Sequence, residues 1–258
     1  MNILQHVKYD ITRIFKSPLG LLGLFLAIIP SIAVIIISLN MDNVFTSPDV
    51  LTGFFAFGGL VLLMFTLRTI VRDMSYGTIQ LFLNSKKNRT MYLYGKLISV
   101  IGIIILFTIL GTVVTLLSTF MMTTGDLEFT DFFKMFGELL IIILFYVTLL
   151  NIINLLTGKA VMVYTTAIVC IILLPTIFNI LSIVPQIGEK IVKVMKYNPL
   201  DFLPDILNSG YLGMEGYQIG ITVVCILVFT VINHFVIINK NIQWFILHLC
   251  VKFNLLDK

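Results

Sequence analysis

Charge is scarce in this sequence of 258 residues. Only 12% of the residues are Asp, Glu, Lys or Arg, about half the share of an ordinary soluble domain, whereas 59% are hydrophobic. A folded globule of this size has too little interior to hide that apolar excess from water. A bilayer does hide it, because each spanning helix needs about 20 mostly apolar residues. The composition therefore excludes a soluble enzyme and indicates a membrane protein.

Reactive side chains are equally sparse. The three histidines are dispersed, and the three cysteines lie far apart at Cys170, Cys225 and Cys250, so no redox, metal or nucleophile–base spacing results. A phosphate-binding loop is also missing. The only Gly-Lys before a small residue, Gly158-Lys159, is followed by Ala160 and has Ile153 where that loop needs a glycine. We expect no catalytic residue, metal or cofactor in this chain, and no ATP hydrolysis by it alone.

What the sequence does contain is a series of long apolar runs. The first run is longer than the apolar core of a secretion signal, and no small-residue cleavage site follows it, so we expect it to remain as a span. The chain is therefore predicted to be a single all-α membrane domain, 1–258, with six transmembrane helices at about 19–39, 51–67, 97–122, 138–156, 160–183 and 217–239.

Basic residues are distributed unevenly between the two sides that these spans define. If the N-terminus is inside, the inner segments hold thirteen Lys and Arg residues and the outer segments only four. Cytoplasmic loops carry the excess of Lys and Arg, so both termini are predicted to be cytoplasmic. Segment 68–96 is then an inner loop and 184–216 a long outer segment.

Amphipathic patterns occur at both ends. Segment 1–17 ends at Ser17-Pro18 and has apolar residues at helical spacing, with Lys and Arg on its other faces. Segment 241–256 has a similar apolar stripe and contains Trp244, which could anchor it at the membrane interface. Both are predicted to be interfacial helices. The outer segment 184–216 has two interpretations: a solvated helix with a capping loop, or a lid over the outer mouth of a translocation path.

Few ionisable residues lie inside the apolar runs, which weighs against an ion-coupled carrier and an intramembrane protease. Asn151 and Asn154 are expected to bond to neighbouring helices or to face a substrate path, and Pro175 is expected to kink the fifth helix. A hydroxyl-rich stripe on the third helix suits close packing; it comprises Thr108, Gly111, Thr112, Thr115, Ser118 and Thr119.

The inner loop 68–96 carries the most informative pattern. An acidic residue precedes Gly-Thr, a short apolar stretch follows, and then come a basic turn with an Arg and a Lys at the next span; these places are held by Asp73, Gly77, Thr78, Leu81, Leu83, Arg89 and Lys96. The series resembles the cytoplasmic loop of ABC-2 type permeases, the membrane-spanning subunits of ABC exporters. Within that family the pattern looks similar to the permeases of exporters for phenol-soluble modulins, which are amphipathic peptides.

The resemblance implies a coupling helix that docks on a separate ATPase subunit. The implied coupling residues are Asp73, Gly77, Thr78, Ile79, Phe82, Leu83 and Arg89. ATP and Mg would bind to two copies of the partner ATPase, and the chain would pair with a second, identical or homologous permease in a bacterial cell membrane. Many family members carry a Glu pair here, whereas this chain has Asp73 and then Ser75. The alternative for the loop is an ordinary basic segment on anionic lipid.

The expected function is the translocation path of an ATP-driven exporter for an amphipathic or hydrophobic cargo, most simply a peptide. Candidate path residues are Phe54, Phe55, Phe57 and Gly58 on the second span and Asn179 on the fifth. A bacteriocin-immunity or drug exporter permease would share the fold. An ion-coupled secondary carrier and a non-transport membrane partner are the alternatives from other classes.

Overall fold

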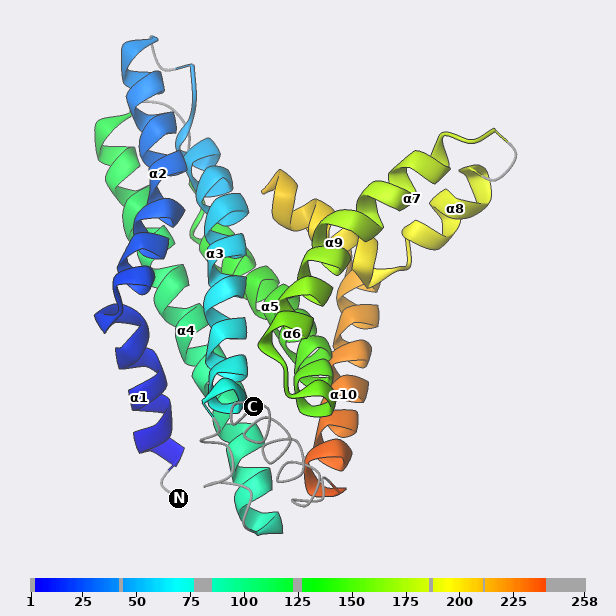
Figure 1. The fold of residues 1–258 in the computed structure, drawn as a ribbon. Helices are drawn as coiled ribbons and strands as arrows, with labels where there is room; N and C mark the ends of the chain where they lie inside the picture. The colour runs from blue at the N-terminus through cyan, green and yellow to red at the C-terminus, as the bar shows by residue number, and fades with distance from the viewer. Residues whose placement is uncertain are drawn as a thin grey trace, which may run out of the picture.

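The computed structural model describes residues 3–41, 44–76, 85–122, 127–185, 188–210 and 212–239. Within these ranges every regular element is a helix and no strand occurs (Figure 1). In chain order the elements are α1 (Ile3–Lys16), α2 (Pro18–Asn40), α3 (Ser47–Ser75), α4 (Lys86–Met121), α5 (Phe129–Thr157), α6 (Ala160–Ile168), the π-helical segment η2 (Val169–Leu173), α7 (Leu174–Ser182), α8 (Gly188–Met195), α9 (Pro199–Ser209) and α10 (Gly216–Asn239).

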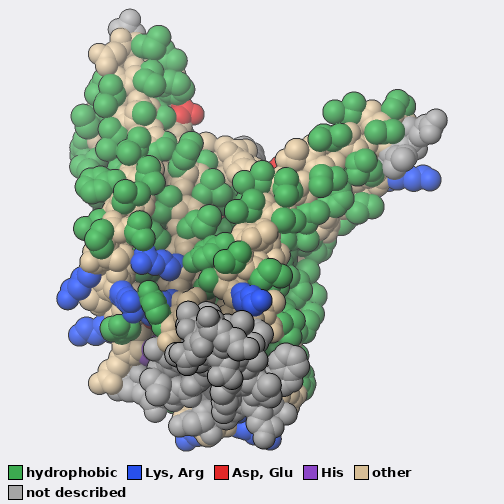
Figure 2. All heavy atoms as spheres, viewed as in Figure 1, with side chains coloured by type: hydrophobic (Ala, Val, Ile, Leu, Met, Phe, Trp, Pro, Cys, Tyr) green, Lys and Arg blue, Asp and Glu red, His purple; other side chains and the backbone are tan. Residues whose placement is uncertain are grey.

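Six of these helical stretches are long and apolar enough to cross a membrane, which confirms the predicted all-α fold with six candidate spans. They are α2, α3, α4, α5, α10 and the continuous stretch α6–η2–α7. Apolar side chains cover the flanks of the molecule, and Lys and Arg gather near the end where α1 lies (Figure 2). A surface of this kind suits contact with lipid rather than with water.

Several helices are longer than the apolar runs that predict them. The helix α3 continues past residue 67 to Ser75, α4 begins at Lys86 instead of 97, and α5 begins at Phe129 instead of 138. Polar caps set these starts, because the Ser85 hydroxyl accepts the Asn88 N–H at 3.2 Å, and Glu128 forms a capping box with Asp131.

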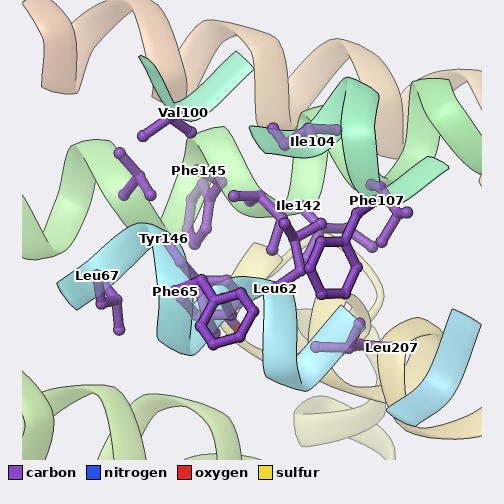
Figure 3. Close-up of a cluster of buried hydrophobic side chains, with 14 of the residues drawn as sticks. Leu62, Phe65, Leu67, Val100, Ile104, Phe107, Ile142, Phe145, Tyr146 and Leu207 are labelled. Atoms are coloured by element: carbon purple, nitrogen blue, oxygen red, sulfur yellow. The ribbon is translucent and has the colours of Figure 1, made fainter. Parts of the chain in front are cut away.

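The helix α3 is the centre of the bundle. Of its most apolar window 67% is buried, against 17% for α10, so the other helices pack around it. Its side chains interleave with those of α4, α5 and α9, as Leu62, Phe107, Ile142 and Leu207 show in Figure 3. This core joins the spans along their length. We call the end where α1 lies the inner end, because it is the end predicted to face the cytoplasm.

Two segments depart from a simple bundle. The helices α7 and α8 pack against each other and extend away from the other helices (Figure 1). The π-helical turn η2 stands directly before Pro175, where the Leu174 N–H bonds to the Val169 carbonyl. Proline has no N–H to continue the ladder, so the break predicted at this proline takes the form of a π-helical turn.

The helix α1 is separate from α2 although only Ser17 lies between them. The Ser17 hydroxyl accepts the Gly20 N–H at 2.9 Å, and Pro18 occupies the first turn of α2. The chain bends there, and α1 packs beside α4 and α2. The second predicted interfacial helix, 241–256, lies outside the described residues.

Candidate functional site at the inner end of the bundle

A buried group of charges joins α1, α3 and α4. Asp10, which has no exposed surface, binds Arg72 Nη2 at 2.6 Å through Oδ1 and Lys96 Nζ at 2.8 Å through Oδ2. The same Lys96 Nζ lies 2.7 Å from Asp73 Oδ2, and Arg72 Nε lies 3.5 Å from Asp73 Oδ1. We call these four residues the inner charge cluster. Two carboxylates and two cations balance, so the cluster is neutral as a whole.

Two further side chains border the inner charge cluster. The Tyr92 hydroxyl donates to Asp73 Oδ2 at 3.2 Å, and His6 Nε2 lies 3.8 Å from Asp10 Oδ2. Burial lowers the pKa of His6, and the charge of Lys96 lowers it further against the pull of Asp10. His6 is therefore neutral at pH 7, and the positive charges that face Asp10 are those of Arg72 and Lys96.

The position of Asp73 bears on the predicted coupling contact. Its carboxylate is 5% exposed and is engaged by Lys96, Arg72 and Tyr92 of its own chain. In this structure Asp73 fixes the end of α3, from which the loop departs, rather than standing free for a partner. Contact of Asp73 with an ATPase stays a prediction.

The other end of the loop is fixed by Arg89. Its guanidinium Nη1 donates to the Ile238 carbonyl at the end of α10, at 2.6 Å. A small apolar cluster beside it joins the inner ends of α3, α4, α5 and α10, and it consists of Met74, Tyr92, Leu93, Leu155 and Ile237. Both flanks of the loop are thus tied to four helices of the bundle. The predicted coupling residues Gly77, Thr78, Ile79, Phe82 and Leu83 lie outside the described residues.

Polar side chains continue inward from this end between α3, α5 and α10. Asn151 Nδ2 donates to Asn233 Oδ1 at 2.9 Å, Asn233 Nδ2 donates to the Thr148 carbonyl at 2.7 Å, and Asn154 Nδ2 donates to the Ile70 carbonyl at 3.3 Å. The expectation that Asn151 and Asn154 bond to neighbouring helices is confirmed. A small pocket beside them is also lined by Lys96 and Thr230.

The candidate path residues do not meet at one surface in this single chain. Phe54 and Phe55 are fully buried and Gly58 is packed against Phe54, so they fill the core. Phe57 is 56% exposed on the outside of α3, and Asn179 is exposed on α7. A path lined by all five would need a rearranged bundle or a second copy.

Sequence reasoning missed Asp10 as a site residue. It lies three residues after Val7 and four before Ile14, so it shares the buried stripe of the amphipathic helix α1. A carboxylate on an apolar stripe calls for a cationic partner. That signal was available, but it does not say which of the many inner Lys and Arg residues is the partner.

The fold and the buried ion pairs at the inner end define the class of protein to which this chain belongs. The chain is a multi-pass α-helical membrane protein whose helix ends are tied on one side by buried ion pairs. A family model covers residues 36–243, and the chain belongs to that family, whose description is "Protein of unknown function (DUF2705)". Comparison with curated proteins gives no match.

Proposed function

We propose that the chain is the permease subunit of an ATP-driven ABC exporter in a bacterial cell membrane. The observation that carries the proposal is the inner loop 68–96: its sequence resembles the ABC-2 coupling loop, and its described parts are held to the bundle through Asp73 and Arg89. A force on such a loop reaches α1, α3, α4 and α10 directly. The chain has no phosphate-binding loop of its own, so two copies of a separate ATPase would supply the force.

The mechanism follows from these connections. ATP-driven closure of two ATPase subunits would displace the loop, and the rigid inner end would pass the displacement to the interface with a second permease. The path would open between the two permeases. The largely apolar spans suit an amphipathic or hydrophobic cargo, for which a peptide of the phenol-soluble modulin kind is our first choice.

Loop variants reconstituted with the ATPase test the proposal. Gly77→Trp and Phe82→Ser alter the expected docking helix and leave the four residues of the inner charge cluster unchanged in the sequence, so they should lower transport-linked ATP hydrolysis at least tenfold while insertion is unchanged. Lys190→Gln, an exposed change on α8, is the matched control and should leave both rates at the wild-type level. Full transport by both loop variants would remove the basis for the coupling assignment.

Charge reversal at Asp73 is a less selective test. A lysine there would face Arg72 and Lys96 inside a buried cluster and would damage the fold as well as any docking contact. Asp73→Asn keeps the shape of the side chain and its ability to form hydrogen bonds. It therefore separates loss of a docking contact from damage to the fold better than charge reversal does.

Cargo and energy source are tested separately. Export of an amphipathic peptide, of a bacteriocin or of a drug by the purified complex distinguishes the exporter types that share this fold. An ion-coupled carrier is the second candidate, and one observation favours it: Asp201 is a buried carboxylic acid whose Oδ1 has no hydrogen-bond partner among the described residues. Transport that survives ATP depletion but fails when the ion gradient is collapsed would establish the carrier instead.

A further inference from the structure

The helix α9 belongs to the outer segment, yet it packs into the core. Phe202, Leu203 and Leu207 are buried in the same cluster as the spanning helices. A Cβ built on Gly59 would lie 2.3 Å from Leu207 Cδ1 and 3.5 Å from Leu139 Cδ2, so α9 approaches the backbone of α3 closely. The C-terminal end of α9 lies higher, where Gly210 meets the Thr52 carbonyl near the start of α3. The chain therefore descends into the bundle before α9 and rises along it.

The first turn of α9 lies beside a spanning helix. The helix packs against α7 and η2, and η2 is the middle of the span Ala160–Ser182. Asn198 caps the helix, since its Oδ1 accepts the Leu200 N–H at 3.1 Å. Asp201 stands three residues after the cap, and the preceding Tyr197 packs on Tyr217 at the start of α10.

Among the described residues, Asp201 is a buried acid without a counter-charge. The residue is only 3% exposed, and no described group bonds to its Oδ1. The charge that acts on it is that of Asp205 on the same helix, and Asp201 in turn is close enough to act on Tyr146 of α5. The Tyr146 hydroxyl is also buried, and no described group bonds to it.

No cation of the described residues forms an ion pair with Asp201, and Lys196, in the turn directly before α9, lies over the Tyr217 ring instead. In their described residues α7 and η2 carry no charged side chain, and α10 carries His234 alone. The charged residues of α3, α5 and α8 form no ion pair with Asp201; they are Asp49, Arg68, Arg72, Asp73, Asp131, Lys134, Glu138, Glu189, Lys190 and Lys193. The contrast with the inner charge cluster is direct, because there each buried carboxylate faces two cations.

Burial disfavours the ionised carboxylate, so the acid keeps its proton to a higher pH here than it does in water. Burial, with a smaller contribution from the charge of Asp205, raises the pKa of Asp201 to about 6. No cavity is needed to hold a proton, in contrast to a metal ion or an ammonium group.

We propose that Asp201 is a proton-binding site that couples protonation to the position of α9. The carboxyl carries a proton while α9 is seated against η2 and Tyr146. When α9 moves outward, the acid releases this proton to water and its carboxylate becomes hydrated. Gly210, which ends α9 at a φ of 68°, and the π-helical turn η2 are the places where the backbone can absorb that movement. Proton binding here is independent of the ATPase and goes beyond the proposed function.

The direction of the pH effect follows from linkage. The seated state has the raised pKa of about 6, and the hydrated acid has the ordinary value of 3.8. Between these values the seated state binds more protons than the released state, so seating weakens as pH rises through this window and levels off above it.

Two measurements on the full chain in lipid vesicles, without ATPase, test the proposal. Infrared difference spectra should show a protonated carboxyl band that disappears with a midpoint near pH 6, is absent in Asp201→Asn and persists in Asp205→Asn with a lower midpoint. Spin labels at Gly137→Cys and Ser209→Cys, in a chain freed of its native cysteines and diluted with unlabelled chain, report the position of α9. Gly137 has nothing within 4 Å of an added Cβ, and Ser209 is exposed.

The label distance should shift from a seated to a released population as pH rises from 4 to 7, and Asp201→Asn should stay seated throughout. A carboxyl band unaffected by Asp201→Asn would overturn the assignment of the proton site. A label distance independent of pH in the wild-type chain would overturn the coupling to α9. Neither result depends on whether an ATPase binds, so the coupling-loop proposal stands or fails separately.

Discussion

Asp10 is the residue on which the inner end depends. It accepts from Arg72 and Lys96 at 2.6 and 2.8 Å and forms the ion pairs that tie α1 to α3 and α4. A buried pair adds little stability relative to an apolar pair, but removing one member leaves a charge without compensation. The cluster is therefore a device that specifies how α1 docks.

Removal of Lys96 tests this role. Lys96→Met leaves Asp10 and Asp73 to share Arg72 alone, so the free energy of unfolding should fall by about 3–5 kcal/mol. Thermal unfolding of the purified chain in detergent measures the loss. Lys190→Met removes an exposed lysine on α8 and should leave the melting temperature unchanged. Equal melting temperatures for both variants would contradict a structural role for the cluster.

The histidine beside the cluster predicts an acid effect on stability. Burial, reinforced by Lys96, lowers the pKa of His6 below 6.5, so the folded state binds this proton less readily than the unfolded state. Stability from this group is present above pH 6.5 and is lost as pH falls through the lowered pKa. Unfolding of the α1 region, followed by hydrogen exchange between pH 7.5 and 5, should show a loss that His6→Gln reduces. The account of His6 fails if both chains respond to acid alike.

Among the helices, α3 and α4 approach each other closely at Gly111 of α4. A Cβ on Gly111 would lie 2.4 Å from the Phe54 ring, a distance that real Cβ atoms do not show. This contact explains the use of a glycine in the hydroxyl-rich stripe of α4, whose hydroxyls bond to carbonyls of their own helix.

Gly111→Val should therefore destabilise the bundle by about 1–3 kcal/mol through overpacking. Phe54→Leu in the same chain should recover part of the loss, because it removes the clashing ring. Gly137→Ala is the matched control on α5, where the added methyl group meets nothing, and it should be neutral or slightly stabilising. Urea unfolding of the three variants measures these changes in stability. A similar loss of stability in Gly111→Val and Gly137→Ala would show that packing at Phe54 is not the cause.

The elements differ in how well the sequence predicts them. Continuous apolar runs reveal the six spans, and Ser17-Pro18 marks the α1–α2 break, because both signals are local. The start of α4 has a local cap at Ser85, but the polar residues of its first turns are held by distant groups: Lys96 by Asp10 and Asp73, and Arg89 by the α10 carbonyl of Ile238. Hydropathy cannot separate such a buried polar turn from a solvated loop.

The helix α9 illustrates the same limit. Its residues 199–209 include two prolines and two acids, which favours an exposed loop. In the structure Phe202, Leu203 and Leu207 turn it into the bundle, and only the tertiary fit to Gly59 and η2 decides this. The proton site at Asp201 could not be predicted for the same reason.

At the scale of the whole molecule, the uneven basic residues predict an orientation. If the inner loop faces the cytoplasm, a cysteine at Lys86 should react with a membrane-impermeant maleimide only after permeabilisation, whereas a cysteine at Lys190 should react in intact cells. Both positions are exposed, so burial does not hide either one. If the Lys86→Cys chain were labelled in intact cells, the orientation would be the opposite of the predicted one. The inner loop would then not face the cytoplasm, where ATP is found.

The candidate path residues do not form one path in a single copy of the molecule. They are buried in the core or scattered over its surface. Under the proposed function, a path would form only with a second permease, and two partner ATPases would act on it through the inner end.

Purification from the native membrane in mild detergent, with identification of the associated chains, is the most direct test of the permease assignment. The account predicts an ABC ATPase present in equal amount, lost when Gly77→Trp disrupts the inner loop and kept when Lys190→Gln alters the outer surface. A chain that comes without any ATPase, even after crosslinking in the membrane, would contradict it.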